Sequence, residues 1–360
     1  MREVPIHHVP GEPGHAGEQH ARLIGDILNP RFVDAYIHQL AEVIRFTPDD
    51  LPQQAVAWLD RLPVQYQEEF AGMARGSGLS TARVTEFLYA DIAHATRTEQ
   101  AIAGPMCSAV VAQLDDRQTW IGRNCDWLVP TLTRGTAAVV HETPHRIPVM
   151  AVGIRGDIDV DTGINAERLW LHIHTLHAVD ETPRDRTMLS WLFWAREALE
   201  TCASLDDLER FIRATARDRG VFAVAGDGKT NEAAIFECTR ATHTRHDIDP
   251  EQPACVTNHT LDAPQRPRRP DAPPSSGTIS RYQALRHHIE TNRPRGGPDD
   301  LISCLAHPHV EMRTRPALRT IYAAVANPQQ DAIWFAAGHH DGTPAASKGA
   351  WSRVAPPWAR

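Results

Sequence analysis

A cysteine, an arginine and an aspartate stand at the open end of a predicted β-hairpin. An apolar, β-branched run begins at Cys107, a turn sequence follows at 115–117, and the return strand ends close to Arg123 and Asp126. Because the start of the first strand lies beside the end of the second in an antiparallel hairpin, we expect the three side chains to meet. A thiol, a guanidinium and a carboxylate on rigid strands can form a site for attack on a carbonyl. The alternative is a small buried cysteine beside a surface Arg–Asp pair.

The segment Gly122-Arg123-Asn124-Cys125-Asp126-Trp127, preceded by Cys107, resembles the opening of the cysteine-type N-terminal nucleophile (Ntn) hydrolases. The similarity is to the acyl-CoA:6-aminopenicillanic acid acyltransferase (isopenicillin N acyltransferase) family and, more distantly, to the choloylglycine hydrolases. It implies that the chain cuts itself between Met106 and Cys107. The freed α-amino group, with a pKa of roughly 7.7–8.0, would then be the general base. Arg123 would hold the thiolate, Asp126 would orient the amine, and Asn124 is a further candidate.

Three later segments resemble the same families in the same order along the chain. In the sequence CVTNHT, Asn258 matches an asparagine that donates to the oxyanion, and in Ser280-Arg281-Tyr282, Arg281 matches an active-site cation. The segment 163–176, GINAERLWLHIHTL, has Arg168 where a glycine is usual, and a second oxyanion donor would fall at His174 or Thr175. An ordinary turn asparagine and a solvated arginine at the start of a helix are the alternatives for the first two.

Composition excludes several classes of partner. The 360-residue chain is 42% hydrophobic and 23% charged, with a formal net charge of −8, which argues against binding nucleic acid. We find no signal peptide and no apolar run approaching the length of a membrane span. Six cysteines without a CxxC pair indicate free thiols instead of a zinc site or a disulfide framework. We therefore expect a cytoplasmic protein without a membrane partner, cofactor or metal.

The chain changes character at Cys107. After a short strand at 3–8, residues up to about 97 are predicted to be helical, and a polar, aperiodic linker leads to Met106. We therefore divide the chain into a helical N-terminal segment, 1–106, and a catalytic domain, 107–360. The helices of the first segment are amphipathic and need an apolar surface to cover, so the two fragments should stay together after cleavage.

The second part alternates strands with pairs of helices. A Pro-rich loop is expected at 262–277 and a tail at the C-terminus. Besides the hairpin, strands are predicted at 137–140, 148–154, 169–176, 221–225, 233–237 and 333–336, and helices at 186–200, 205–216, 280–290 and 298–306. This pattern favours an α+β protein with two mostly antiparallel sheets between helical layers. It is also the four-layer αββα Ntn-hydrolase sandwich that the resemblance implies.

The resemblance implies an autoproteolytic amidohydrolase or acyltransferase that acts on a small N-acyl amide or acyl thioester through an S-acyl intermediate on Cys107. Two alternatives remain open. The pairs His172-x-His174, His307-x-His309 and His339-His340 suggest a metal-dependent hydrolase, because alternate residues of a strand share a face. The other alternative is a non-catalytic binding protein that has kept the Ntn fold.

Overall fold

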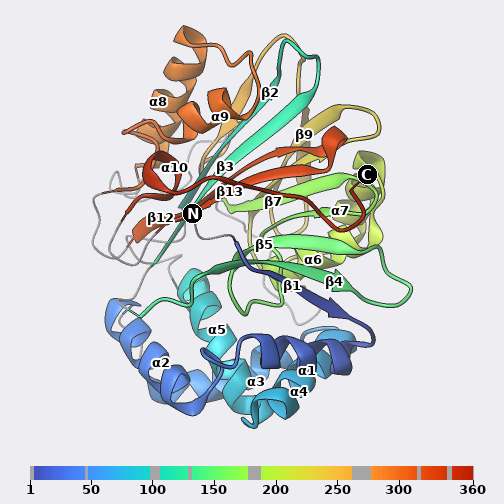
Figure 1. Ribbon diagram of the computed structural model, residues 1–360, viewed down its shortest axis with the longest axis vertical. Coiled ribbons are helices and arrows are strands. Elements are labelled where there is room, and N and C mark those ends of the chain that lie inside the picture. Colours follow the sequence, from blue (N-terminus) through green and yellow to red (C-terminus); the bar gives the residue numbers. More distant parts are fainter. Residues whose placement is uncertain are drawn as a thin grey trace.

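Two stacked β-sheets covered by helices make up most of the molecule, and a further group of helices lies at one end (Figure 1). The structure is a computed structural model. It describes residues 4–44, 48–97, 106–128, 132–176, 188–261, 277–313, 318–338 and 343–359. The expected linker before Met106 and most of the Pro-rich loop lie outside the described residues.

The N-terminal segment is helical after a short first strand, as predicted. The strand is β1 (Ile6–Pro10), and the helices are α1 (Pro13–Leu23), α2 (Pro30–Ile44), α3 (Leu51–Leu59), α4 (Val64–Ser77) and α5 (Thr81–Arg97), with a 3₁₀ turn at Pro48–Asp50 before α3. No helix of the described residues is both long and apolar enough to cross a membrane.

The larger sheet has eight strands. Besides β1, they are β4 (Thr136–Glu142), β5 (Val149–Ile154), β6 (Thr162–Asn165), β7 (Leu169–Thr175), β8 (Val221–Asp227), β9 (Glu232–Cys238) and β10 (His243–Asp247). Their spatial order is β1-β4-β5-β6-β7-β8-β9-β10, and only the β1–β4 pair is parallel. The N-terminal segment therefore supplies an edge strand to the sheet of the second part.

The smaller sheet has six antiparallel strands and carries the predicted hairpin. They are β2 (Met106–Gln113), β3 (Thr119–Leu128), β11 (Ala254–Val256), β12 (Leu318–Asn327), β13 (Ala332–Ala337) and β14 (Ser352–Val354), in the order β11-β2-β3-β12-β13-β14. The prediction of a tail at the C-terminus is wrong at β14, because this strand pairs with β13 and buries Val354 beside Ile333.

Helices cover both outer faces of the sheet pair. They are α6 (Trp191–Thr201), α7 (Leu205–Ala214), α8 (Thr278–Thr291), α9 (Pro298–Leu305) and α10 (Ala345–Lys348). Ile121 and Val140 belong to a core between the two sheets, whereas Val110 packs with Leu301 of α9 on the outer face of the smaller sheet. Phe193 of α6 joins the larger sheet and the N-terminal helices in a third core.

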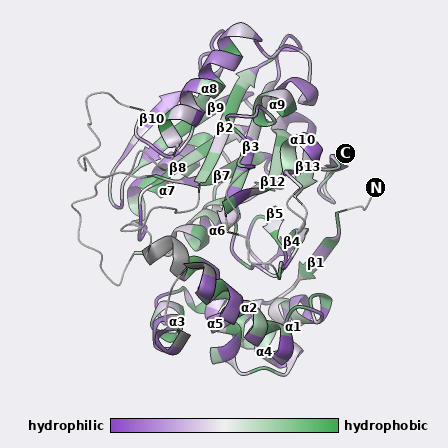
Figure 2. Cartoon of the chain, turned by 90° about the vertical axis from the view of Figure 1, so that its left-hand side faces the viewer, coloured by the Kyte–Doolittle hydropathy of each residue, from purple (hydrophilic) through white to green (hydrophobic). Residues whose placement is uncertain are grey.

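The order of layers is therefore helix, sheet, sheet, helix, and the predicted four-layer α+β sandwich is confirmed. Hydrophobic residues concentrate on the strands between the helical layers (Figure 2). Burial on both faces explains why β2 is an almost unbroken apolar run, MCSAVVAQ, instead of alternating with polar residues.

Glycines let α1 and α4 pack with their backbones in contact. A Cβ atom on Gly17 would lie 2.0 Å from the carbonyl oxygen of Glu69, and one on Gly72 would lie 2.1 Å from the carbonyl oxygen of Gly14. Gly14 and Gly17 belong to the glycine-rich opening of α1, so this opening has a packing role between two helices.

We expect Gly17→Ala to destabilise the protein by about 3 kcal/mol, the upper end for overpacking, because the clash is with backbone that cannot change rotamer. Thermal unfolding would measure it. Gly25→Ala is the matched control, since a Cβ there meets nothing closer than 3.6 Å and its conformation is not left-handed. Equal melting temperatures for the two variants would contradict the close packing of α1 on α4.

Candidate active site

The hairpin of β2 and β3 forms as predicted and fixes which residues face each other. Its register pairs Cys107 with Cys125, Ala109 with Arg123, and Met106 with Asp126. Directly opposed residues share a face of the sheet, and successive residues alternate. Cys107 and Arg123 therefore point between the two sheets, whereas Asp126 points to the other face.

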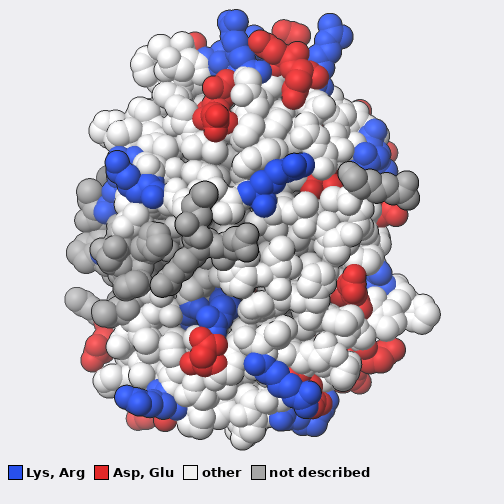
Figure 3. All heavy atoms as spheres, in the orientation of Figure 1, with Lys and Arg blue, Asp and Glu red and all other residues white. Residues whose placement is uncertain are grey.

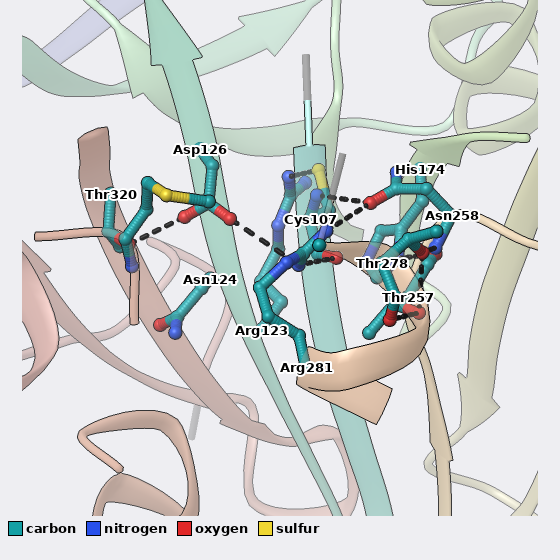
Figure 4. A network of polar contacts seen from close by, with 12 residues as sticks. Cys107, Arg123, Asn124, Asp126, His174, Thr257, Asn258, Thr278, Arg281 and Thr320 are labelled. Atoms are coloured by element: carbon teal, nitrogen blue, oxygen red, sulfur yellow. Dashed lines mark hydrogen bonds and ion pairs between the residues drawn. The ribbon is translucent and has the colours of Figure 1, made fainter. Parts of the chain in front are cut away.

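Three side chains hold three different atoms of Cys107 (Figure 4). Arg123 Nη2 donates to its sulfur at 3.3 Å, and the Cys107 backbone N–H donates to Asn258 Oδ1 at 3.0 Å. Arg281 Nη1 donates to the Cys107 carbonyl oxygen at 2.7 Å. Residues distant in the sequence thus converge on one cysteine that is only 4% exposed.

Arg123 is fixed from the opposite sheet. It is fully buried, and Nη1 donates to the Asp161 carbonyl oxygen at 2.9 Å and to the Thr162 hydroxyl at the start of β6. Its guanidinium also lies over the ring of Tyr322 on β12, 5.3 Å from the centroid. The Tyr322 hydroxyl in turn donates to Asp161 Oδ1 at 2.6 Å, so this network orients the guanidinium toward the cysteine.

Asp126 joins the group through Arg281. The Thr320 hydroxyl of β12 donates to its Oδ1 at 2.5 Å, and Arg281 Nη1 lies 3.6 Å from its Oδ2. Burial raises the pKa of Asp126 to about 6, although Arg281 and Thr320 act in the opposite direction. In the intact chain the Cys107 N–H donates to Asn258 and not to Asp126, which was expected to contact the cysteine nitrogen.

Asn258 follows β11 and is held by its own network. Its Oδ1 accepts from Arg281 Nη2 at 2.9 Å as well as from the Cys107 N–H. Its Nδ2 donates to the Thr175 carbonyl oxygen at 2.8 Å, and its backbone N–H donates to Thr278 Oγ1 at 2.8 Å. In the intact chain Asn258 therefore acts as an acceptor toward Cys107.

The remaining candidates lie at different distances from this centre. Thr175 contacts Asn258 directly, and His174 on the same strand contacts the Thr257 carbonyl oxygen through Nδ1 at 3.3 Å. Asn124 faces away from the cysteine and donates to the Leu305 carbonyl oxygen at 2.9 Å. The structure thus brings His174 and Thr175 toward the centre and assigns Asn124 to the packing of α9.

The thiol of Cys107 is activated in spite of its burial. Burial by itself would raise its pKa, but a hydrogen bond from the Cys125 thiol and the charge of Arg123 outweigh it, so the pKa of Cys107 lies below its usual value. Cys202, Cys238, Cys255 and Cys304 behave in the opposite way, because burial raises their pKa values to about 11 or 12. A thiolate is the nucleophilic form, and of these five cysteines only Cys107 has a lowered pKa.

The histidine pairs do not assemble into a metal site in the described part of the chain, where no three side chains of ligand type are placed to hold an ion. His172 Nδ1 accepts from Trp170 Nε1 at 3.0 Å, and the ring stacks on His174 with centroids 5.0 Å apart. His339 and His340 lie outside the described residues.

Charges are mixed on the face seen in Figure 3. Basic side chains lie beside acidic ones there, and the described part of this face carries no extended basic surface.

Comparison with known proteins identifies the family. A family model described as acyl-coenzyme A:6-aminopenicillanic acid acyl-transferase matches residues 113–341. This is more than half of the chain, and it contains Arg123, Asp126, Asn258 and Arg281; the match begins after Cys107. The chain belongs to this family, and the resemblance that its sequence carries is confirmed. No curated protein sequence matches the chain.

Solved structures of similar proteins include three acylases and hydrolases. Penicillin V acylase from Agrobacterium tumefaciens is 15% identical, with 64% of this chain and 83% of that chain covered and a TM-score of 0.48. A mutant conjugated bile acid hydrolase from Clostridium perfringens is 9% identical, with coverage of 70% and 98% and a TM-score of 0.48. The N-acylethanolamine-hydrolyzing acid amidase ortholog from Caenorhabditis elegans is 16% identical, with coverage of 62% and 93% and a TM-score of 0.45.

Proposed function

We propose that this protein is an autoproteolytic amidohydrolase or acyltransferase whose nucleophile is Cys107. The observation that carries the proposal is that the sulfur, nitrogen and carbonyl oxygen of this residue each have a separate partner, namely Arg123, Asn258 and Arg281. A cysteine that serves as nucleophile and, through its freed amine, as base needs all three atoms held.

Maturation would begin with attack of the Cys107 sulfur on the Met106 carbonyl carbon. The C–N bond of this peptide breaks, its nitrogen takes the proton and becomes the α-amine, and the Met106 acyl group remains on sulfur as a thioester. Water then hydrolyses the thioester and frees the thiol. Met106 is 1% exposed and is the first residue of β2, so an intramolecular nucleophile reaches this bond far more readily than an external protease.

Turnover would repeat the same chemistry on a bound substrate. The α-amine accepts the thiol proton, the sulfur attacks the acyl carbonyl, and the amine or thiol of the substrate leaves with that proton. An S-acyl-Cys107 intermediate results. Attack by water completes hydrolysis, and attack by a second amine completes acyl transfer, so the two reactions differ only in the acceptor.

A panel of N-acyl amides and acyl thioesters tests the activity directly. Release of the free acid, together with an acyl mass added to the fragment that begins at Cys107, would support the proposal. Adding a competing amine then separates transfer from hydrolysis. A mature protein that binds these compounds but never acquires the acyl mass would contradict the proposal and favour the binding-protein alternative.

We further propose that Asn258 contributes to the stabilisation of the oxyanion once cleavage has freed the cysteine nitrogen. On fully matured Asn258→Ala protein we expect kcat to fall by about 10²–10³ with little change in KM, because the bond forms mainly in the transition state. Asn124→Ala is a matched control, since this buried asparagine of β3 faces α9.

The first step of the test is to confirm by mass that both variants are cut. If matured Asn258→Ala keeps the wild-type kcat, the oxyanion assignment is wrong and His174 or Thr175 becomes the next candidate.

We also expect the two fragments to remain associated after cleavage. Arg134 before β4 is fully buried and donates through Nη1 to Asp91 of α5 at 2.6 Å, and Tyr36 of α2 donates to the same carboxylate at 2.8 Å. A comparable buried pair joins Arg196 of α6 to Glu69 of α4 at 2.7 Å. These ion pairs and the shared hydrophobic core join residues before the predicted cleavage site to residues after it.

Gel filtration of the matured protein should therefore give one peak that contains both fragments. Arg134→Gln should lower stability by about 3–5 kcal/mol, because it leaves the Asp91 carboxylate buried without its charge partner. Arg210→Gln, which breaks an exposed pair with Asp207 on α7, should change little. Fragments that separate in buffer without denaturant would contradict this prediction.

We propose the cytoplasm as the place of action. The support is the cysteine inventory, since all six cysteines are free, as is usual where thiols are kept reduced.

A further inference from the structure

A second cysteine stands directly opposite the nucleophile. Cys107 on β2 and Cys125 on β3 are register partners in the antiparallel pair. Opposed residues in such a pair have Cα atoms about 4.5–5.5 Å apart, which falls inside the range of about 4.4–6.8 Å that a disulfide spans. No backbone movement is therefore needed to bring these two residues within bonding reach.

The two side chains also converge. As direct register partners they share one face of the sheet, and both side chains point between the sheets. The Cys125 thiol donates to Asp161 Oδ2 at 3.5 Å, the residue that also holds Arg123 beside Cys107. A disulfide requires facing Cβ atoms as well as a suitable Cα separation, and directly opposed residues of an antiparallel pair have both in general.

We propose that Cys107 and Cys125 form a reversible disulfide when a peroxide oxidises the nucleophile. The Cys107 thiolate attacks one oxygen of the peroxide, the O–O bond breaks, and hydroxide (or an alkoxide) leaves, so sulfur is oxidised to a sulfenic acid as the peroxide is reduced. The Cys125 sulfur then attacks the sulfenic sulfur, its proton leaves with the displaced hydroxyl as water, and the S–S bond forms.

The environment makes this reaction selective. Arg123 stabilises the Cys107 thiolate at 3.3 Å, and thiolate character sets the rate of attack on a peroxide. Cys202, Cys238, Cys255 and Cys304 are buried and have raised pKa values, so they stay thiols. Cys107 is therefore the first cysteine to be oxidised, and Cys125 is the cysteine directly opposite it on β3.

The consequence for activity rests on the proposed function. A disulfide withdraws the sulfur from both self-cleavage and acyl transfer, and a dithiol restores it. It also traps the sulfenic acid before further oxidation to the sulfinic acid, which dithiols do not reverse. Cys125 thus makes the oxidative inactivation of Cys107 reversible, whereas without Cys125 the oxidation would be irreversible.

Peptide mapping tests the proposal without a known substrate. Matured wild-type protein is treated with hydrogen peroxide, remaining thiols are alkylated in acid, and the protein is digested with trypsin. We expect the peptide 107–117 joined to the peptide 124–134, with the mass of two hydrogen atoms lost, and separation of the two by dithiothreitol.

Cys125→Ser and Cys125→Ala are the test variants, and Cys304→Ser is the control because Cys304 packs on the outer face of the smaller sheet. Without Cys125, Cys107 should instead gain two or three oxygen atoms that dithiothreitol does not remove, while the control behaves like wild type. Thermal melting confirms that each variant is folded.

Each protein is also assayed against its own untreated activity. Wild type should recover nearly all of it with dithiothreitol, and the Cys125 variants should recover little. Oxidation of wild-type Cys107 to the sulfinic acid with Cys125 still alkylatable, or a bond from Cys107 to another cysteine, would overturn the proposal. The mapping does not depend on turnover, and in uncut protein the same disulfide would join the peptide 98–117 to the peptide 124–134. Its outcome is therefore independent of whether the proposed enzymatic function is correct.

Discussion

Cys107→Ala is expected to leave the chain at full length and to abolish turnover. The same sulfur is assigned both the self-cleavage and the attack on substrate, and without cleavage no α-amine is freed. Loss of a catalytic nucleophile reduces kcat by about 10⁶-fold in a comparable hydrolase system, and we expect an effect of this order here. Intact mass would report the cleavage, and release of the acid product would report the turnover.

The control for this variant is Cys255→Ala. Cys255 is also buried on the smaller sheet, but it belongs to the outer core and burial raises the pKa of its thiol to about 12. This variant should be cut and active, apart from a modest loss of stability. Full maturation and wild-type turnover of Cys107→Ala would remove Cys107 from the mechanism.

Asp126→Asn is expected to reduce kcat by about 10²–10⁴, the range for a positioned acid–base group, while the protein stays folded. An asparagine keeps an oxygen that accepts from Thr320, but it loses the negative charge that faces Arg281 and that we propose orients the new α-amine after cleavage. Steady-state kinetics on matured protein would measure the loss, and thermal melting would verify the fold. A normal rate with an unchanged melting temperature would return Asp126 and Arg281 to a structural pair.

The pH dependence of kcat/KM tests whether the ionised form of Asp126 is needed, independently of the size and position of its side chain. Burial raises the pKa of Asp126 from 3.8 to about 6, so the carboxylate is ionised above about pH 6 and becomes protonated below it. If the ionised form orients the amine, kcat/KM falls as the pH drops through about 6. This fall adds to the loss of the neutral α-amine below roughly pH 7.7–8.0. In Asp126→Asn, the pH dependence of kcat/KM should show only the decrease caused by protonation of the α-amine.

The hairpin was predictable because its determinants are local. An apolar run, a turn and a return strand specify the pairing, and the pairing alone brings Cys107 and Arg123 to the same face. The approach of Asn258 and Arg281 is not local. These residues come from the segment after β11 and from α8, more than 100 positions along the chain, and only the family resemblance indicated them before the fold was known.

The network behind Arg123 was not anticipated, because it depends on β6 and on β12. Strand β12 is the central partner of β3, yet its sequence LRTIYAAVAN is rich in alanine, which is uncommon in strands. Small side chains fit there because the strand is covered on both faces. Tyr322 and Thr320, which support Arg123 and Asp126, were therefore missed with it.

The division at residue 106 remains a prediction about covalent structure. In the fold, β1 adds to the larger sheet and α1 to α5 share a core with α6, so the two predicted parts are packed as one body. A cut before Cys107 would therefore change the chemistry of one residue without requiring the layers to separate.

The intact mass of freshly purified protein tests the central claim most directly. Self-cleavage predicts two species, one of residues 1–106 and one that begins with an unmodified Cys107, and a single full-length species for Cys107→Ala. Wild-type protein that turns over an acyl substrate while its mass shows only the uncut chain would contradict the assignment of Cys107 as an N-terminal nucleophile.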